Sequence, residues 1–368
     1  MKDLKLYIHI PFCKSKCYYC DFCSTSSKKY ISSYLNELIN ESNDISTRLN
    51  DYVVKSIFIG GGTPTILENG QLSDTFYKII KNFNIDLEEF TVEANPDTIT
   101  ICKLNELKSM GVNRISIGVQ TLNDNILKLL NRTHNSAVAI DSIRLCKQYF
   151  DNISVDLMIG LPTQTIADIE YVINTICDLG VNHISCYTLQ IEENTVLKKQ
   201  IQDGKISVPD DDKTADMYNF AYNLLKKRGF NRYEISNFAK DNKISKHNYG
   251  YWTRKNYLGL GVTAYSLIDN IRFNNVSSIK EYIANRRYVD IEKLSIKEQM
   301  FEEIMLGFRT KKGINIANFN EKYKTDFIKL YKKQIEKMQN YLKFYDNYLS
   351  IKEEFFEVSN SIILEFMD

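Results

Sequence analysis

Four of the eight cysteines lie close together near the beginning of the chain. Three of them form the pattern Cys13-Lys-Ser-Lys-Cys17-Tyr-Tyr-Cys20, directly after an apolar segment. Thiolates at such short spacing can surround one metal centre, and iron–sulfur clusters are normally held by cysteine thiolates. Three local ligands leave one iron of a cubane cluster open, and an open metal position is where chemistry takes place. The pattern therefore predicts a 4Fe-4S cluster on Cys13, Cys17 and Cys20.

Structural zinc is the alternative interpretation of this pattern, with His9 or Cys23 as the fourth ligand. Structural zinc sites usually combine separate pairs of ligands, so we favour the cluster. The remaining cysteines stand in apolar settings and are expected to be small buried hydrophobic residues. They are Cys102, Cys146, Cys177 and Cys186.

Short segments rich in branched apolar residues alternate with amphipathic segments over the first two thirds of the chain. The predicted strands are 4–10, 55–59, 90–93, 114–118, 153–157 and 183–187, with a further candidate at 230–235. The predicted helices between them are 30–49, 71–83, 98–110, 136–149 and 165–179. Strands that alternate with helices form parallel β-α-β units, which predicts an α/β fold.

Residues with unusual chemistry gather at the carboxyl ends of these predicted strands. They are the cysteine segment 13–20, the glycine run 60–62, Glu93, Gln120, Asp156 and Tyr187. In α/β barrels this edge of the sheet carries the functional site. We therefore expect a partial or full (β/α) barrel, with an open doubly wound sheet as the alternative.

The pattern changes near residue 290. Segments 302–306 and 326–341 are predicted helices, and segments 348–351 and 355–358 are predicted short strands. We expect residues 1–235 to form the barrel core, 236–288 a connecting segment, and 289–368 a small, mostly helical C-terminal domain with a hairpin.

The overall charge is balanced, with 47 Lys and Arg against 46 Asp and Glu. This balance gives no basic surface, so nucleic acid is not an expected partner. No apolar run approaches the ~18–20 residues that span a bilayer, and the beginning of the chain lacks the apolar core of a signal peptide. We therefore expect a cytoplasmic protein.

The cysteine pattern resembles the signature of the radical S-adenosylmethionine (SAM) superfamily. In that superfamily SAM chelates the fourth iron, and an electron from the cluster cleaves SAM to methionine and a 5′-deoxyadenosyl radical. The resemblance implies a partial (β/α) barrel with SAM as a cofactor. Its implied SAM contacts are Tyr7, Tyr19, Gly61, Gly62, Thr63, Glu93, Gln120, Arg132 and Asp156. The glycines would let the backbone approach the ligand closely.

Longer strings are similar to the oxygen-independent coproporphyrinogen III oxidase family across nearly the whole chain. They are Tyr7-Ile-His-Ile-Pro-Phe-Cys13, Gly60-Gly-Gly-Thr-Pro-Thr65, Ile117-Gly-Val-Gln120, Asp156-Leu-Met-Ile-Gly-Leu-Pro162 and Leu258-Gly-Leu-Gly261. The family holds an enzyme, which oxidatively decarboxylates coproporphyrinogen III to protoporphyrinogen IX in porphyrin biosynthesis, and a chaperone that carries heme on the same fold.

Two features favour the chaperone. The enzyme has a further cysteine two residues after the third, where this chain has Phe22. The string His247-Asn-Tyr-Gly-Tyr-Trp252 resembles a motif of the chaperone, which implies heme as a ligand. By this resemblance His247 binds the heme iron, and Tyr251 and Trp252 pack on the porphyrin.

The expected function is thus heme binding and transfer, with the decarboxylating enzyme as the alternative. The expected partners are heme, a heme acceptor protein and an electron donor protein, neither of which the sequence names. We expect membrane contact only through such an acceptor.

Overall fold

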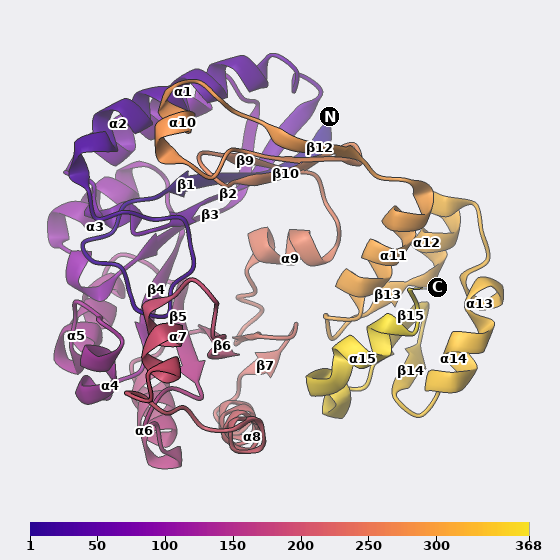
Figure 1. Ribbon diagram of the computed structural model, residues 1–368. Helices are drawn as coiled ribbons and strands as arrows, with labels where there is room; N and C mark the ends of the chain where they lie inside the picture. Colours follow the sequence, from indigo (N-terminus) through magenta and orange to yellow (C-terminus); the bar gives the residue numbers. More distant parts are fainter. Residues whose placement is uncertain (368) are drawn as a thin grey trace.

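The computed structural model describes residues 1–367, and a twelve-stranded sheet forms its centre (Figure 1). The middle of the sheet is parallel, as expected for strands joined by helices. In spatial order its parallel strands are β9 (Tyr257–Leu260), β1 (Lys2–Ile10), β2 (Tyr52–Gly61), β3 (Ile85–Ala94), β4 (Arg114–Gln120), β5 (Ile153–Ile159) and β6 (His183–Thr188). The prediction of an α/β fold with a partial barrel is confirmed.

Helices cover the outer face of this parallel sheet (Figure 1). They are α1 (Ile31–Ser46), α2 (Gln71–Ile80), α3 (Ile101–Ser109), α4 (Asp124–Leu129), α5 (Ser136–Cys146), α6 (Ile166–Asp178) and α8 (Asp211–Lys227), with the short α7 (Val196–Gln202) beyond β6. The carboxyl halves of β1 to β5 are mostly buried because helices lie on one face and the barrel interior on the other.

The candidate strand at 230–235 is the one strand prediction in the barrel that is wrong. Only β7 (Asn231–Arg232) forms there, and it pairs antiparallel with β8 (Asn237–Ala239) at the sheet edge. The additional parallel strand is β9, which lies at the opposite side of the six strands and pairs with β1. Local strand propensities could not show this, because the edge of the sheet at which a strand is added depends on pairing between segments far apart in the chain.

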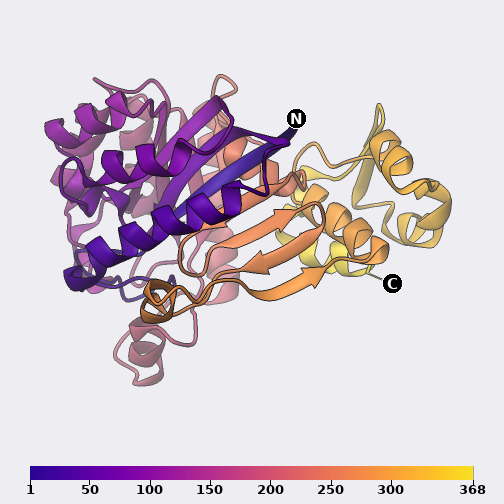
Figure 2. The same ribbon diagram turned by 90° about the horizontal axis from the view of Figure 1, so that it is seen from above.

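Residues 236–288 form more than a connection. They contribute β8, α9 (Lys246–Trp252), β9, β10 (Tyr265–Ile268), β11 (Ile271–Asn274) and α10 (Ile279–Ile283), and the antiparallel β9–β12 extension lies beside α1 (Figure 2). Asp269 and Asn270 join β10 to β11 with φ of 47° and 67°, which is the two-residue turn that matches the twist of a hairpin.

One buried carboxylate attaches α1 to this extension. Glu41 is fully buried, and it accepts hydrogen bonds from the Gly261 amide at 2.8 Å, from Asn275 Nδ2 at 2.7 Å and from the Tyr282 hydroxyl. Burial raises the pKa of Glu41. Because three donors from separate parts of the chain converge on one side chain, Glu41 fixes the loop that follows β9.

The C-terminal unit has its own hydrophobic core, which includes Ile304, Phe308, Phe319, Phe327 and Phe366. Its elements are α11 (Ile296–Gly307), β13 (Ile314–Asn315), α12 (Ile316–Tyr323), α13 (Phe327–Leu330), α14 (Lys332–Met338), β14 (Leu342–Tyr345), β15 (Tyr348–Ile351) and α15 (Ser359–Leu364). The sequence-based boundary at 289 is the first residue of β12 (Val289–Lys293), which still pairs with β11 in the large sheet.

The hairpin of this unit is present, but its predicted second strand is wrong. Segment 355–358 lies in a 3₁₀ helix (Glu353–Val358), and the partner of β15 is β14. Asp346, with φ of 47°, allows a tight turn directly before β15. The Phe356 side chain is buried in the second core instead of standing on a sheet.

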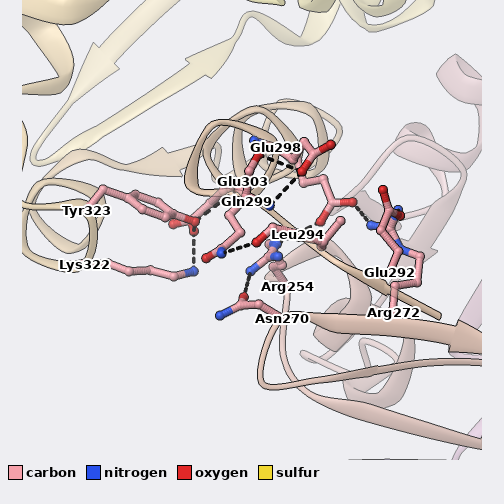
Figure 3. A network of polar contacts seen from close by, with 12 residues as sticks. Arg254, Asn270, Arg272, Glu292, Leu294, Glu298, Gln299, Glu303, Lys322 and Tyr323 are labelled. Carbon is pink, nitrogen blue, oxygen red and sulfur yellow. Dashed lines mark hydrogen bonds and ion pairs between the residues drawn. The ribbon is translucent and has the colours of Figure 1, made fainter.

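Ion pairs join the C-terminal unit to the barrel. Arg254, just after α9, donates to Glu302 of α11 at 3.0 Å and to Asn270 at 2.8 Å, and Arg272 pairs with the same Glu302 (Figure 3). At the other end of the sheet Arg232 pairs with Glu357 at 3.1 Å. Within residues 1–367 no helix is both long and apolar enough to cross a membrane.

Glu41→Ala should lower the free energy of unfolding by about 3–5 kcal/mol, because it leaves three buried donors without an acceptor. Urea unfolding monitored by circular dichroism measures this loss. Glu41→Gln keeps one acceptor oxygen and should cost less. The exposed Glu170 is the control, and Glu170→Ala should stay within about 0.5 kcal/mol of the parent. A Glu41→Ala variant as stable as the parent would contradict the assigned role.

Candidate functional site

The three cysteines lie on the loop between β1 and α1, at the carboxyl end of the parallel strands. Cys13, Cys17 and Cys20 are half-buried and line one cavity together. The Cys13 amide donates to the Thr25 carbonyl at 3.0 Å, which joins the beginning of the loop to its later part, and the Tyr18 amide in its middle donates to the Leu130 carbonyl at 3.1 Å. Burial raises the pKa of the Cys13 and Cys20 thiols.

The arrangement of these thiols suits a cluster. Among the described residues 1–367, no three His, Cys, Asp or Glu side chains are close enough together to hold a single metal ion. The ligands of a cubane need not meet that condition, because each thiolate binds a different iron atom. The fourth ligands considered for zinc, His9 and Cys23, line a different cavity.

The glycine turn that ends β2 packs against the cysteine loop. The Gly62 amide donates to the Ile10 carbonyl and the Thr63 amide to the Phe12 carbonyl, both at 2.8 Å. A Cβ on Gly62 would lie 2.6 Å from the Phe12 carbonyl oxygen. Gly61 has φ of 107°, and a Cβ there would lie 2.4 Å from the His9 ring. These glycines are therefore required by the turn and its packing, in addition to any approach of a ligand.

Two half-buried carboxylates line the same cavity. Glu93, on β3, accepts a hydrogen bond from the Gly61 amide at 3.0 Å, and Asp156, on β5, accepts one from Ser116 at 3.3 Å. Burial and the neighbouring Asp156 raise the pKa of Glu93 to about 7, and burial also raises the pKa of Asp156. A ligand that brings positive charge and N–H donors would offset this cost, and SAM carries both.

Arg132 connects the cysteine loop to the barrel. Its Nη1 lies 3.3 Å from the Cys17 sulfur, its Nη2 donates to Asn95 at 2.9 Å, and its buried Nε has no partner among the described residues. Gln120 has φ of 68° at a bulge of β4 and accepts a hydrogen bond from Tyr187 at 3.2 Å. A strained polar residue beside an unpaired buried donor is typical of a binding site.

The structure brings most of the predicted residues into this one cavity, which we call the cluster cavity. They are Cys13, Cys17, Cys20, Tyr19, Gly61, Gly62, Thr63, Glu93, Gln120, Arg132 and Asp156. Tyr7 does not line it, since that side chain faces the neighbouring cavity with His9. Asn95, Ser116 and Tyr187 also line the cluster cavity. Tyr187 is one of the residues expected at the strand ends, and Asn95, directly after β3, could have been identified by the same signal, whereas Ser116 lies within β4.

A second cavity of about 840 Å³ adjoins the first across the cysteine loop. Its wall contains the aromatic residues Tyr7, Phe22, Tyr251, Tyr257 and Tyr265. Lys16, Phe22 and Ser24 line both cavities, and 66% of the Phe22 surface is exposed. We call this space the aromatic cavity.

The residues of the candidate heme motif lie in three different places. His247 is 0% exposed, and its Nδ1 and Nε2 are hydrogen bonded to the Ser56 and Tyr251 hydroxyls, each at 2.9 Å. Burial lowers the pKa of His247 well below its ordinary value. Tyr251 lines the aromatic cavity. Trp252 instead lines a cavity of about 450 Å³ between α9 and the C-terminal unit.

Comparison with known proteins identifies the family. A model of the Radical SAM superfamily matches residues 7–176, and one of the HemN C-terminal domain matches residues 294–360. The heme chaperone HemW of Lactococcus lactis is 36% identical over 100% of this chain and 98% of its own length. The chain belongs to the HemW family of radical SAM proteins.

Other relatives agree with this placement. The HemW of Bacillus subtilis is 40% identical over 86% of each chain. The solved structure of Escherichia coli coproporphyrinogen III oxidase, HemN, has a TM-score of 0.85 at 20% identity, with coverage of 99% of this chain and 90% of that one. This similarity shows the shared fold. Membership in the radical SAM superfamily implies a 4Fe-4S cluster and SAM.

Anaerobic reconstitution should give a brown protein with about four iron and four sulfide per chain, the content of one cubane cluster. Replacement of Cys13, Cys17 or Cys20 by Ala should abolish the cluster, because each removes one thiolate. Cys23→Ala is the matched control and should retain it, since Cys23 lines the aromatic cavity. One zinc per chain without labile sulfide would contradict the assignment.

SAM affinity should fall as the pH falls below about 7. Glu93 is protonated there in the free protein, and its carboxylate form is the one that accepts N–H donors, so binding releases a proton. The expected slope is at most about tenfold in Kd per pH unit. Anaerobic equilibrium dialysis measures it for the cluster-loaded protein. Glu93→Gln should remove this part of the slope, and equal slopes in parent and variant would disprove the role of Glu93.

Proposed function

We propose that this protein is a heme chaperone of the radical SAM type, which binds heme and passes it to an acceptor protein. The observation that carries the proposal is the aromatic cavity beside the cysteine loop, whose wall includes Tyr251 of the His247–Trp252 motif. Its volume of about 840 Å³ lies within the ~300–1,000 Å³ of small-molecule sites. Heme is a flat aromatic ligand, and the rings in the cavity wall can pack against it.

The position of Phe22 supports a carrier over the decarboxylating enzyme. The enzyme's additional cysteine would stand at this position, between the two cavities, where it could take part in proton or electron transfer. Phe22 offers an exposed apolar ring and no titratable group. An exposed aromatic side chain on a cavity rim is better suited to holding a hydrophobic ligand than to catalysis.

In this proposal the cluster is held by Cys13, Cys17 and Cys20, and bound SAM would supply radical chemistry when the cluster is reduced. The residues of this chain orient that ligand. Glu93 accepts N–H donors, Arg132 presents its unpartnered Nε, and the turn at Gly61–Thr63 presents backbone groups beside the cysteine loop. The electron donor and the heme acceptor are proteins outside this chain.

Two assays on the full-length protein test the proposal. Titration with heme should give saturable binding of about one heme per chain, because the motif and the aromatic cavity occur once. His247→Ala and Tyr251→Ala should weaken the binding, Tyr251→Ala because it removes a ring from the cavity wall and His247→Ala because Tyr251 then loses its hydrogen-bond partner. An anaerobic assay with coproporphyrinogen III, SAM and a reductant should give no protoporphyrinogen IX.

Robust formation of protoporphyrinogen IX by the parent would establish the enzyme in place of the carrier. If neither substitution changes the heme affinity, the motif is not part of the heme-binding site. The matched control is Tyr171→Ala, an exposed aromatic residue on α6 that lines none of these cavities, which should bind heme as the parent does.

A further inference from the structure

Among the described residues that line the aromatic cavity, Lys16 is the one cationic side chain. The same wall holds one carboxylate, Asp21, and its other members are aromatic, apolar or small and polar, apart from His9. Burial lowers the pKa of His9, so this histidine is neutral near pH 7. A negatively charged group of a ligand in this cavity therefore has Lys16 as its counter-ion.

The Lys16 ammonium is attached to the cysteine loop and still has donors to offer. Its Nζ donates one hydrogen bond, to the Phe22 carbonyl at 3.1 Å, and an ammonium carries three N–H donors. Within residues 1–367 no carboxylate lies at ion-pair distance from this nitrogen, whereas Lys14 on the same loop pairs with Asp97 at 3.2 Å. Of these two lysines, Lys16 is the one whose charge is not neutralised by a protein carboxylate.

The contacts of Lys16 place its charge on the part of the loop that separates the two cavities. Phe22, whose carbonyl accepts from Lys16, lines both of them. Burial raises the pKa of the Cys23 thiol and the Lys16 charge lowers it, so the ammonium lies near a sulfur atom of the aromatic cavity. The same charge also acts on Cys20 of the cluster cavity. Because Lys16 is exposed, its long side chain can turn toward a ligand on the aromatic side.

Heme brings the complementary charge to this cavity. Its flat ring carries two propionate groups, and a carboxylate that leaves water without a cationic partner costs free energy. A lysine ammonium is a compact charge that suits a single carboxylate. While the ring packs against tyrosines of the wall such as Tyr257 and Tyr265, a propionate can meet Lys16, and the hydroxyls of Ser24 and Ser277 line the same space.

We propose that Lys16 binds a heme propionate, so that the aromatic cavity selects porphyrins with ionised carboxylates. The inference rests on the proposed heme binding and names the part of heme that the cysteine loop recognises. Asp21 in the same wall opposes the propionate charge and keeps the attraction small. Because Lys16 stands between Cys13 and Cys17, the loop that holds the cluster on one side contacts heme on the other.

The test compares ferric heme with its dimethyl ester, in which both propionates are uncharged. Each is titrated by absorbance into the full-length, cluster-loaded protein under anaerobic conditions at low ionic strength. Lys16→Met should raise the Kd for heme by about two- to fivefold, the contribution of an exposed ion pair, and leave the Kd for the ester unchanged. The effect on heme should decline at about 1 M salt, because salt screens exposed charges.

Three further variants isolate the charge. Lys16→Arg keeps it and should bind both ligands as the parent does. Lys14→Met is the matched control, because it removes a lysine of the same loop that pairs with Asp97 and lines neither cavity, and its heme Kd should equal that of the parent. Asp21→Asn removes the opposing charge and should lower the Kd for heme alone. Circular dichroism and the iron content of each variant verify its fold and its cluster.

The outcomes separate this inference from the proposed function. A parent that binds neither heme nor the ester would refute the heme carrier itself. If the parent binds heme and Lys16→Met weakens heme and the ester equally, Lys16 only supports the loop, and the propionate contact is refuted. An unchanged heme Kd in Lys16→Met refutes it as well, and a raised Kd for SAM in that variant would then assign the Lys16 charge to the cluster cavity.

Discussion

The register of β1 between β2 and β9 is the constraint on which both cavities depend. His9 stands opposite Gly60 and Ile10 opposite Gly61, which brings the glycine turn against the start of the cysteine loop. On its other edge Tyr7 stands opposite Gly259, so Tyr7 and His9 face the space under the loop that follows β9. A shift by one residue would turn these side chains to the opposite face of the sheet. One strand thus sets the walls of two binding spaces.

Buried acidic groups divide into two kinds that serve different ends. Glu41 is surrounded by donors, and its burial holds the β9–β12 extension on α1. Glu93 and Asp156 have few donors, and burial raises the pKa of both, with the Asp156 charge adding to the rise at Glu93. The first arrangement stabilises the folded chain, whereas the second stores an electrostatic cost that a positively charged ligand can relieve.

The sequence predicted the parallel strands because their apolar runs reflect burial on both faces, which depends on local composition. It did not predict the pairing of β9 with β1, since that pairing joins segments far apart in the chain. The cluster cavity was largely foreseeable from residues at strand ends, as with Glu93 and Asp156. The three motif residues expected to contact heme together do not share one environment. His247 and Tyr251 are four residues apart and share a helix face, whereas Trp252 is one residue further round and faces the C-terminal unit.

The segment from Lys16 to Ser24 is a wall of both cavities and has almost no regular secondary structure. Attachment of three of the loop's cysteines to a cubane would restrict its backbone, and the same restriction applies to Phe22 and Ser24 on the aromatic side. The first ligand to bind then orders part of the loop, so the second ligand incurs a smaller entropy cost for ordering the same loop. Occupancy of the two cavities would therefore be thermodynamically linked, and by reciprocity each ligand would strengthen the binding of the other.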